Sequence, residues 1–493
     1  MSIALINPNL VVQRNDPLTT GIVYMPLALA YVAGAFKKNH IPFKVIDAFG
    51  QKPFQARKEG KFLVLGLTCE EICQELAGET RIVFIYAINL TNHLSTIKII
   101  QAIKAAKPSV KVVVLENTQA VTAYSLKIVA QEFYQSGADY ILTGESDHRA
   151  VELARILLEG QEHKLEAVEG LGGPDFYRPP ASVIADLDTL DFPPWELFPL
   201  ENYWSLRFAH GPVSSKRYLP ILTSRGCPYP CRFCVVPATN NQRWRARSAK
   251  NVVDEMERRV NALGVNEFHI EDLDPTISDE RIREICHEII RRNLEIIWKI
   301  AAGTKVETIR NEETVELMAR AGCRYISVSP ETGSPRLLKL MRKPFDLKHA
   351  LRLVKEMNRV RIRSQACFVL GFPTENDEDR ELTWQMVHDL TKNGIDEIAL
   401  FIVTPVPGSA IFEEFSGYSH LSELNFTPAW RQDYKELNRF RLRLYRDFLM
   451  WKLWYHPLKM IVQPMNFLRR HFETKMEMVP YRALVLKWLE VMA

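Results

Sequence analysis

The sequence predicts an α/β protein with two successive parallel sheets and a helical C-terminal region. In residues 1–160, and again in residues 216–415, short apolar runs alternate with amphipathic segments. This alternation is typical of parallel strands joined by helical crossovers. Glycine and proline punctuate residues 161–215, which are therefore expected to be a linker. Residues 416–493 are rich in aromatic and basic residues and are expected to be helical.

The first alternating half predicts a doubly wound parallel sheet. Six strands are expected, at residues 3–6, 43–46, 62–67, 82–86, 111–115 and 140–142. The longest amphipathic segments between them are residues 26–38, 94–106 and 123–136. Sheets of this kind bind ligands at the carboxyl ends of their strands.

The second alternating half predicts a partial barrel of six β/α units. The expected strands are residues 218–223, 267–271, 296–300, 325–328, 364–370 and 397–403. Helices are expected to begin near residues 248, 278, 312, 348 and 377. Barrel enzymes place their chemistry at the carboxyl ends of the strands, so the residues that follow each strand are the candidates for a site.

Composition limits the classes of function. The chain has 493 residues, of which 47% are hydrophobic and 25% charged, as in ordinary globular proteins. A formal net charge of +4 is small for this length and gives no support to nucleic-acid binding. No secretory signal, membrane span or disulfide framework is expected, so a cytoplasmic setting is predicted. Cys69 and Cys73 are interpreted as packed thiols.

Three of the eight cysteines lie in one short loop, directly after the first expected strand of the second half. The loop reads Cys227-Pro-Tyr-Pro-Cys231-Arg-Phe-Cys234. Its prolines exclude a helix, so the chain must wrap and can bring three sulfurs together. A cubane iron–sulfur cluster normally takes four thiolates, and three would leave one iron open to another ligand.

Zinc is the alternative metal for this loop. A structural zinc site takes four ligands, often from paired Cys-x-x-Cys motifs, and no second pair exists here. His210 and His269 are candidates for a fourth ligand, but neither has the usual spacing. The iron–sulfur interpretation is favoured.

The cysteine loop resembles the signature loop of radical S-adenosylmethionine (radical SAM) enzymes, Cys-x3-Cys-x-Phe-Cys. This resemblance implies that Cys227, Cys231 and Cys234 hold a [4Fe–4S] cluster. It also implies that S-adenosylmethionine chelates the fourth iron and is cleaved to a 5′-deoxyadenosyl radical. The fold implied is a TIM-like partial (β/α)6 barrel. Phe233 is a candidate flat wall for a planar ligand.

Three further strand ends resemble cofactor-binding positions of the same family. Glu271 and Asp272 follow the second strand and would contact the methionyl amino group; the alternative is a solvated pair before a turn. Glu331, in Ser329-Pro-Glu-Thr-Gly, resembles the ribose-binding glutamate, in a segment that also caps a helix. Gly371 lies on the strand that would flank the adenine.

The first half resembles the Rossmann-like, cobalamin-binding domain that precedes many radical SAM barrels. The matching segments are Leu5-Ile-Asn-Pro8, Val45-Ile-Asp47 and Leu142-Thr-Gly-Glu145. The resemblance implies bound cobalamin. However, the family's Gly-Gly pair is replaced by Glu116-Asn-Thr-Gln119, and no lower-ligand histidine is identified. The alternative is a Rossmann-like domain retained for packing or substrate contact.

The resemblance predicts a radical SAM enzyme that modifies an unactivated carbon, with cobalamin-dependent methyl transfer favoured. Ring closure or oxidative rearrangement is the second enzymatic interpretation, and a non-catalytic corrinoid or cluster carrier is the third. The expected partners are a small-molecule substrate, hydrophobic or lipid-like in one interpretation, and an electron donor such as flavodoxin or ferredoxin. The Arg243-Trp-Arg-Ala-Arg247 run is interpreted as a solvated or carboxylate-binding face rather than a nucleic-acid site.

The C-terminal region has two interpretations. Its basic and aromatic helices could lie on a membrane surface. Amphipathic helices more often face a core, so closure of the barrel mouth is favoured over peripheral membrane contact.

Overall fold

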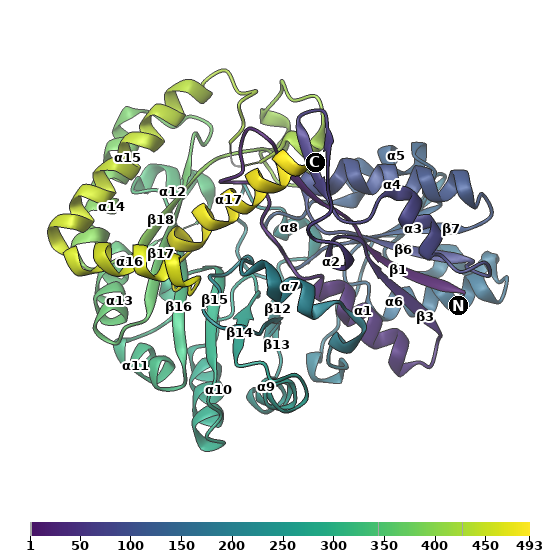
Figure 1. Ribbon diagram of the computed structural model, residues 1–493, viewed down its shortest axis with the longest axis horizontal. Helices are drawn as coiled ribbons and strands as arrows, with labels where there is room; N and C mark the ends of the chain where they lie inside the picture. Colours follow the sequence, from purple (N-terminus) through teal and green to yellow (C-terminus); the bar gives the residue numbers. More distant parts are fainter. Residues whose placement is uncertain (1, 344, 426) are drawn as a thin grey trace.

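The structure is a computed structural model that describes residues 2–343, 345–425 and 427–493. Two α/β units lie side by side, with the N-terminal unit on the right of Figure 1 and the barrel on the left. Three helices at the C-terminus lie against the barrel and reach back toward the N-terminal unit. The predicted α/β class with two parallel sheets is confirmed.

The N-terminal sheet has seven strands in the order β10-β9-β8-β7-β6-β1-β3. Five of them are parallel: β1 (Ile3–Asn7), β3 (Phe43–Asp47), β6 (Ile82–Ala87), β7 (Lys111–Glu116) and β8 (Tyr140–Leu142). The main crossover helices are α1 (Leu27–Lys38), α4 (His93–Ala106), α5 (Leu126–Gln135) and α6 (Asp147–Leu158). Strands β1 and β6 are buried at every residue, as expected for a sheet covered on both faces.

Two short strands inside the predicted linker extend this sheet. Strand β9 (Leu171–Gly173) pairs antiparallel with β8, and β10 (Phe176–Tyr177) pairs with β9. The glycines that favoured a linker in the sequence lie in β9, where the side chains of Phe176 and Tyr177 occupy the space beside them.

One predicted strand belongs to a different sheet. Residues 62–67 were expected in the parallel sheet, but β5 (Phe62–Leu65) pairs antiparallel with β2 (Leu10–Gln13) and β4 (Ala56–Glu59). A two-residue turn at Gly60, whose φ is +59°, joins β4 to β5 as a hairpin. Apolar periodicity identifies a strand but not its partner.

The second sheet has six parallel strands whose spatial order follows the chain, which is the order of a partial β/α barrel. They are β11 (Tyr218–Ile221), β14 (Glu267–Ile270), β15 (Ile297–Thr304), β16 (Cys323–Glu331), β17 (Arg363–Leu370) and β18 (Glu397–Ile402). The helices between them are α9 (Ala249–Leu263), α10 (Asp279–Arg291), α11 (Glu312–Arg320), α12 (Pro335–Met341), α13 (Leu347–Arg359) and α14 (Asp377–Lys392).

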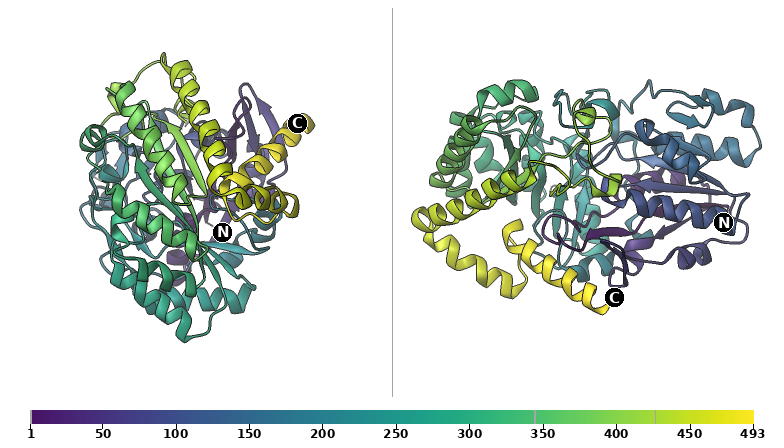
Figure 2. Two further views of the ribbon diagram at one scale, coloured as in Figure 1. Left: turned by 90° about the vertical axis from the view of Figure 1, so that its left-hand side faces the viewer. Right: turned by 90° about the horizontal axis from the view of Figure 1, so that it is seen from above.

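The C-terminal region is helical, as predicted, and closure of the barrel mouth by this region stays a prediction. Helix α15 (Tyr434–Tyr455) starts near the carboxyl end of β17 and runs along α14 and β18. Helices α16 (Pro457–Arg469) and α17 (Lys475–Met492) follow it along the outside of the barrel (Figure 2). At the amino end of β18, Glu397 accepts hydrogen bonds from the backbone N–H groups of Lys475 (3.1 Å) and Met476 (2.5 Å).

Buried ion pairs join the two α/β units. Arg225 forms a bidentate pair with Asp147 (2.8 and 3.0 Å), at the start of α6. Arg245 forms a second bidentate pair with Glu145 (2.9 and 2.8 Å). The two arginines lie on the paired short strands β12 (Ser224–Arg225) and β13 (Arg245–Ala246). The interpretation of the arginine run as a carboxylate-binding face is therefore confirmed for Arg245.

Among the residues that the structure describes, no helix has both the length and the apolar character that a membrane span requires.

Candidate active site

The cysteine loop connects β12 to the short helix α8 (Val236–Thr239), at the carboxyl end of β11. Gly226 begins the loop with φ +82°, and a Cβ there would lie 1.9 Å from the carbonyl oxygen of Arg243. Only glycine fits this turn. The preceding residue is the buried Arg225, so the start of the loop is fixed on the N-terminal unit.

The three cysteines of the loop are free and half-buried. Burial raises the pKa of each thiol, to about 11 for Cys227 and about 12 for Cys234. Cys231 also raises the pKa of Cys227 and of Cys234, whereas the ammonium of Lys343 lowers the pKa of all three thiols. Within the loop, the N–H of Cys234 donates to the carbonyl of Cys231 (3.2 Å). Metal coordination deprotonates thiols and removes this burial penalty.

The donor set fits an iron–sulfur cluster better than zinc. Among the described residues, no three His, Cys, Asp or Glu side chains converge as ligands of one metal ion. His210 is instead hydrogen-bonded to Glu271 (2.6 Å), and His269 to Glu267 (2.8 Å). A zinc ion needs its ligands around a single centre, whereas a cubane takes each thiolate on a different iron.

Glu331 and Lys343 lie beside Phe233 of the cysteine loop. Glu331 ends β16 with φ +67°, a left-handed conformation that is unfavourable for a residue other than glycine. Its carboxylate forms a buried ion pair with Lys343, and the Lys343 Nζ lies 5.9 Å from the centre of the Phe233 ring. Strained residues of this kind are concentrated at functional sites.

The neighbours Glu271 and Asp272 have different surroundings. Asp272 is fully buried and accepts hydrogen bonds from the backbone and hydroxyl of Thr223 (2.7 and 2.6 Å) and from the hydroxyl of Ser224 (2.5 Å). Its oxygens therefore hold the strand that leads into the cysteine loop. Glu271 lies in a cavity with His210, whose pKa is lowered by burial.

This cavity lies between the carboxyl ends of the two sheets. Its volume is about 70 Å³, and Glu271 and His210 face Tyr24, Gln119 and Thr122 of the N-terminal unit across it. Pockets for drug-sized ligands measure about 300–1,000 Å³. A corrinoid is larger than such ligands, so it does not fit the cavity in this conformation.

The segment that replaces the glycine pair is held in place by buried hydrogen bonds. The carboxylate of Glu116 accepts the backbone N–H groups of Leu126 (2.9 Å) and Gly144 (2.7 Å), and burial raises the pKa of Glu116 to about 7. The side chain of Asn117 donates to the Ile88 carbonyl (2.7 Å). Asn117 and residues 119–122 line the cavity, so this segment occupies part of the space between the two units.

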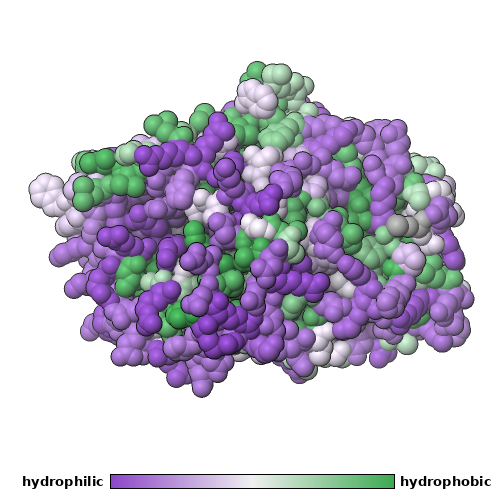
Figure 3. All heavy atoms as spheres, turned by 60° about the horizontal axis from the view of Figure 1, so that its bottom comes forward, coloured by the Kyte–Doolittle hydropathy of each residue, from purple (hydrophilic) through white to green (hydrophobic). Residues whose placement is uncertain are grey.

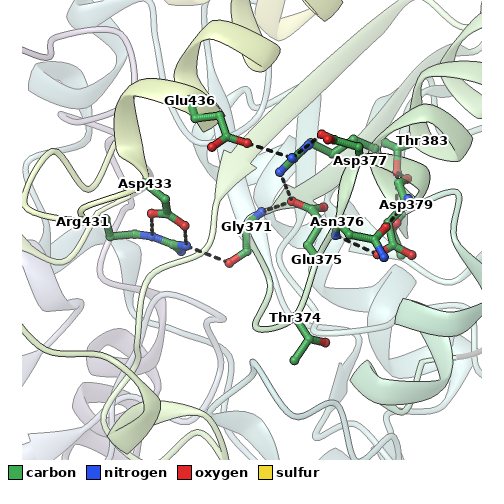
Figure 4. Close-up of polar contacts among 12 residues, drawn as sticks. Gly371, Thr374, Glu375, Asn376, Asp377, Asp379, Thr383, Arg431, Asp433 and Glu436 are labelled. Atoms are coloured by element: carbon green, nitrogen blue, oxygen red, sulfur yellow. Dashed lines mark hydrogen bonds and ion pairs between the residues drawn. The ribbon is translucent and has the colours of Figure 1, made fainter.

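Gly371 is packed against α15 rather than against an open cavity (Figure 4). Its N–H donates to Glu375 (2.7 Å), and its carbonyl accepts from Arg431 (3.0 Å). Its φ is +72°, and a Cβ there would lie 2.4 Å from Leu437 Cδ1. The sequence predicted that an adenine would approach Gly371 closely. In the structure the group closest to a Cβ at this position is the side chain of Leu437.

Sequence patterns do not identify two contributors to the site, Lys343 and Lys305, and they suggest a different role for a third, His210. Lys343 follows α12 and has no motif around it. Lys305 follows β15, and its Nζ lies 4.2 Å from the ring centre of Tyr229 in the cysteine loop. His210 had been considered only as a metal ligand. Its partner Glu271 is 61 residues away, a separation that sequence periodicity does not reach.

The same part of the chain matches a family model. Residues 221–387, from β11 to α14, match the model of the radical SAM superfamily. This part of the chain is therefore similar to the radical SAM superfamily. The match contains the cysteine loop and the carboxyl ends of five barrel strands, including Glu271 and Glu331.

Curated relatives extend the similarity beyond the barrel. An uncharacterized methyltransferase of Pyrococcus horikoshii is 28% identical over 298 residues, 60% of this chain and 61% of that protein. The cytidylyl-2-hydroxyethylphosphonate methyltransferase of Streptomyces wedmorensis is 24% identical over 504 residues, 90% of this chain and 89% of that protein. An anaerobic magnesium-protoporphyrin IX monomethyl ester cyclase of Cereibacter sphaeroides is 29% identical over 339 residues, 64% of this chain and 52% of that protein. The matches thus cover less than two thirds of the Pyrococcus and Cereibacter proteins.

Two solved structures share the fold of this chain. The radical SAM methyltransferase TsrM of Kitasatospora setae, with tryptophan and a SAM analogue bound, has a TM-score of 0.63 at 19% identity. The similarity covers 84% of this chain and 75% of TsrM. The cobalamin-dependent radical SAM enzyme OxsB, with aqua-cobalamin bound, has a TM-score of 0.63 at 17% identity and covers 90% of this chain and 56% of OxsB.

Proposed function

We propose that this protein is a radical SAM enzyme that modifies an unactivated carbon of a small-molecule substrate. The observation that carries the proposal is the set of three neighbouring, half-buried thiols, Cys227, Cys231 and Cys234, at the carboxyl end of the first barrel strand. These thiols would hold a [4Fe–4S] cluster. When bound, such a cluster supplies the electron that cleaves S-adenosylmethionine.

The neighbouring side chains suggest how the protein binds S-adenosylmethionine. Glu331 would accept hydrogen bonds from the ribose hydroxyls, with Lys343 compensating its charge in the absence of ligand. Phe233 would provide an apolar wall for the adenine. Glu271 would accept hydrogen bonds from the methionyl ammonium. Asp272 would act on the site indirectly, because it holds Thr223 and Ser224 in place before the cysteine loop.

Methyl transfer is the favoured outcome, with cobalamin as the methyl carrier. Its support is the methyltransferase relative that matches almost the whole chain, and the shared fold of TsrM and OxsB. Cobalamin would lie between the N-terminal sheet and the barrel after displacement of residues 117–122. Ring closure is the second candidate, because a cyclase is also among the relatives.

An electron donor such as flavodoxin or ferredoxin is part of the proposal, because the cluster must be reduced before each cleavage. Pro228 and Pro230 are exposed on the cysteine loop and offer a surface for its approach. The free state of all eight cysteines fits a reducing compartment such as the cytoplasm.

Anaerobic reconstitution with iron and sulfide tests the proposal. The protein is expected to show cubane absorbance and to release 5′-deoxyadenosine from S-adenosylmethionine in dithionite, as measured by mass spectrometry. Cys231→Ala should abolish both signals. Cys73→Ala, which removes a half-buried thiol of the N-terminal unit, should retain both. A cluster that never yields 5′-deoxyadenosine, even with candidate substrates, would instead support a carrier.

The cobalamin content of protein purified anaerobically from a cobalamin-supplied host tests the methyl carrier. Because Asn117 and Gln119 belong to the segment that replaces the family's glycine pair and line the cavity between the units, the variant Asn117→Gly/Gln119→Gly should bind more cobalamin than the wild type. Product mass then separates the two reactions, since methyl transfer adds a methyl group and ring closure removes hydrogen. Absence of cobalamin from both proteins would argue against the methyl carrier but not against cleavage of S-adenosylmethionine.

A further inference from the structure

We propose that helices α15, α16 and α17 form a docking face for a membrane surface rich in anionic lipid. The proposal is independent of the reaction. It rests on three observations, namely an apolar helix with almost no buried residues, apolar stripes on its two neighbours, and an excess of positive charge in the same segment.

Helix α16 is the centre of this face. Of its thirteen residues, only Asn466 is buried. Its apolar side chains point to solvent instead of into a core, and the exposed ones recur at helical spacing: Leu458, Ile461, Val462, Met465 and Leu468. Leu468 is 80% exposed and Leu458 is 74% exposed. A helix that turns its apolar stripe outward lacks the partner that normally covers it.

The neighbouring helices continue the apolar face. Near the end of α15, Met450, Leu453 and Trp454 are exposed, and Trp454 is 82% exposed. On α17 the exposed residues are Leu484, Trp488, Val491 and Met492. Helix α16 contacts both of these helices. Hydrophobic residues project at the left and upper edges of the molecule in Figure 3, where these helices lie.

The charge of the segment favours a lipid surface over a second copy of the chain. Residues 434–493 contain twelve Lys and Arg but only five Asp and Glu, although the whole chain has a net charge of only +4. Arg469 and Arg470 are exposed at the C-terminal end of α16, and Arg446 on α15 and Lys487 on α17 are exposed beside the acidic partners Asp447 and Glu490. A positively charged face repels its own copy but attracts anionic headgroups.

The arrangement matches that of helices that lie in a membrane interface. Such helices insert an apolar face to about 5–10 Å and keep cations in the headgroup region. Tryptophan is enriched at this depth because its ring is amphipathic. Since no described helix spans a bilayer, the contact would be peripheral and reversible.

Flotation of the full-length protein with vesicles tests the proposal. The protein is expected to float with phosphatidylcholine vesicles that contain phosphatidylglycerol, less with phosphatidylcholine alone, and less at high salt. Leu458→Glu/Ile461→Glu should lower the bound fraction at least tenfold. The control is Ile128→Glu on α5, because Ile128 is 54% exposed and Ile461 is 61% exposed. Both sites are on the surface, so both variants should fold, which thermal denaturation would check.

Three results would overturn the proposal. The first is the absence of flotation with either kind of vesicle. The second is an equal loss of binding in the Ile128→Glu control. The third is a dimer, detected by light scattering, that Leu458→Glu/Ile461→Glu dissociates while vesicles bind nothing, because this face would then join two copies of the chain.

Discussion

At the residue scale, the site depends on a glutamate held in an unfavourable conformation. Glu331 adopts φ +67° at the end of β16, which costs about 1–2 kcal/mol relative to an ordinary backbone conformation. Its ion pair with Lys343 is buried. Because water does not solvate either charge there, each charge is stabilised by the other. The pair places carboxylate oxygens, which accept hydrogen bonds, beside the cysteine loop.

Removing one member of this pair should destabilise the fold more than removing both. Glu331→Gln leaves the Lys343 charge buried without its carboxylate and should lower the free energy of unfolding by about 3–5 kcal/mol. Glu331→Gln/Lys343→Met should recover part of that loss, as denaturant titration would show. Both variants should bind S-adenosylmethionine more weakly than the wild type, whereas a purely structural glutamate would give restored binding in the double variant.

The candidate residues of this site are easier to find in the sequence than their environment. The cysteine loop carries its own pattern, and Glu331 lies in a recognisable strand-end segment. Lys343 was missed because nothing in its local sequence marks it, and its importance comes from where α12 ends. The different surroundings of Glu271 and Asp272 also escaped prediction, because they depend on the packing of β11 against β14.

At the element scale, the contact between β17 and α15 explains why residue 371 is glycine. The turn after β17 has positive φ and lies directly against Leu437, while Arg431 and Glu375 bond its backbone. The turn at Gly371 and helix α15 therefore pack directly against each other.

Gly371→Ala should be more destabilising than an alanine placed at another left-handed glycine. Gly60 is the matched control, since its φ is +59° and nothing lies within 4 Å of a Cβ built there. Gly60→Ala should cost about 1 kcal/mol for the backbone alone. Gly371→Ala should cost about 1–3 kcal/mol more because of overpacking against Leu437. Equal shifts in thermal denaturation would refute a role for α15.

The strands were easier to predict than their pairing. All six barrel strands lie close to the residue ranges predicted from apolar runs. They were predictable because each β/α unit repeats the same local pattern of an apolar strand followed by an amphipathic helix. Strand β5 was assigned to the wrong sheet, since its four buried residues fit either a parallel or an antiparallel neighbour. The exposed stripe of α16 could not be predicted either, because an amphipathic pattern does not tell which face is covered.

At the scale of the whole molecule, the two units are joined through buried charge. Arg225 and Asp147 pair across the interface, as do Arg245 and Glu145. Burial alone would raise the pKa of Asp147, but Arg225 reverses this effect and the pKa lies below its usual value. The pair therefore stabilises the assembled molecule most when Asp147 is ionised.

Acid should weaken this interface in a defined range. The contribution of Asp147 is complete above the ordinary aspartate pKa of about 3.9 and is lost as the pH falls through the lower pKa of the folded state. Asp147→Asn should cost about 3–5 kcal/mol at neutral pH, because Arg225 remains buried without its partner. As the pH falls from about 5 to about 2, the free energy of unfolding of the Asp147→Asn variant should decrease less than that of the wild type. Parallel pH curves for the two proteins would contradict this assignment.

The anchoring of Arg225 affects how these proteins can be recombined. Because Arg225 immediately precedes Gly226 and the first cysteine, its carboxylate partner in the other unit also sets the position of the metal-binding loop. A chimaera that exchanges the N-terminal unit for that of a relative must bring an aspartate equivalent to Asp147. Without it, iron incorporation would fail although every cysteine is present.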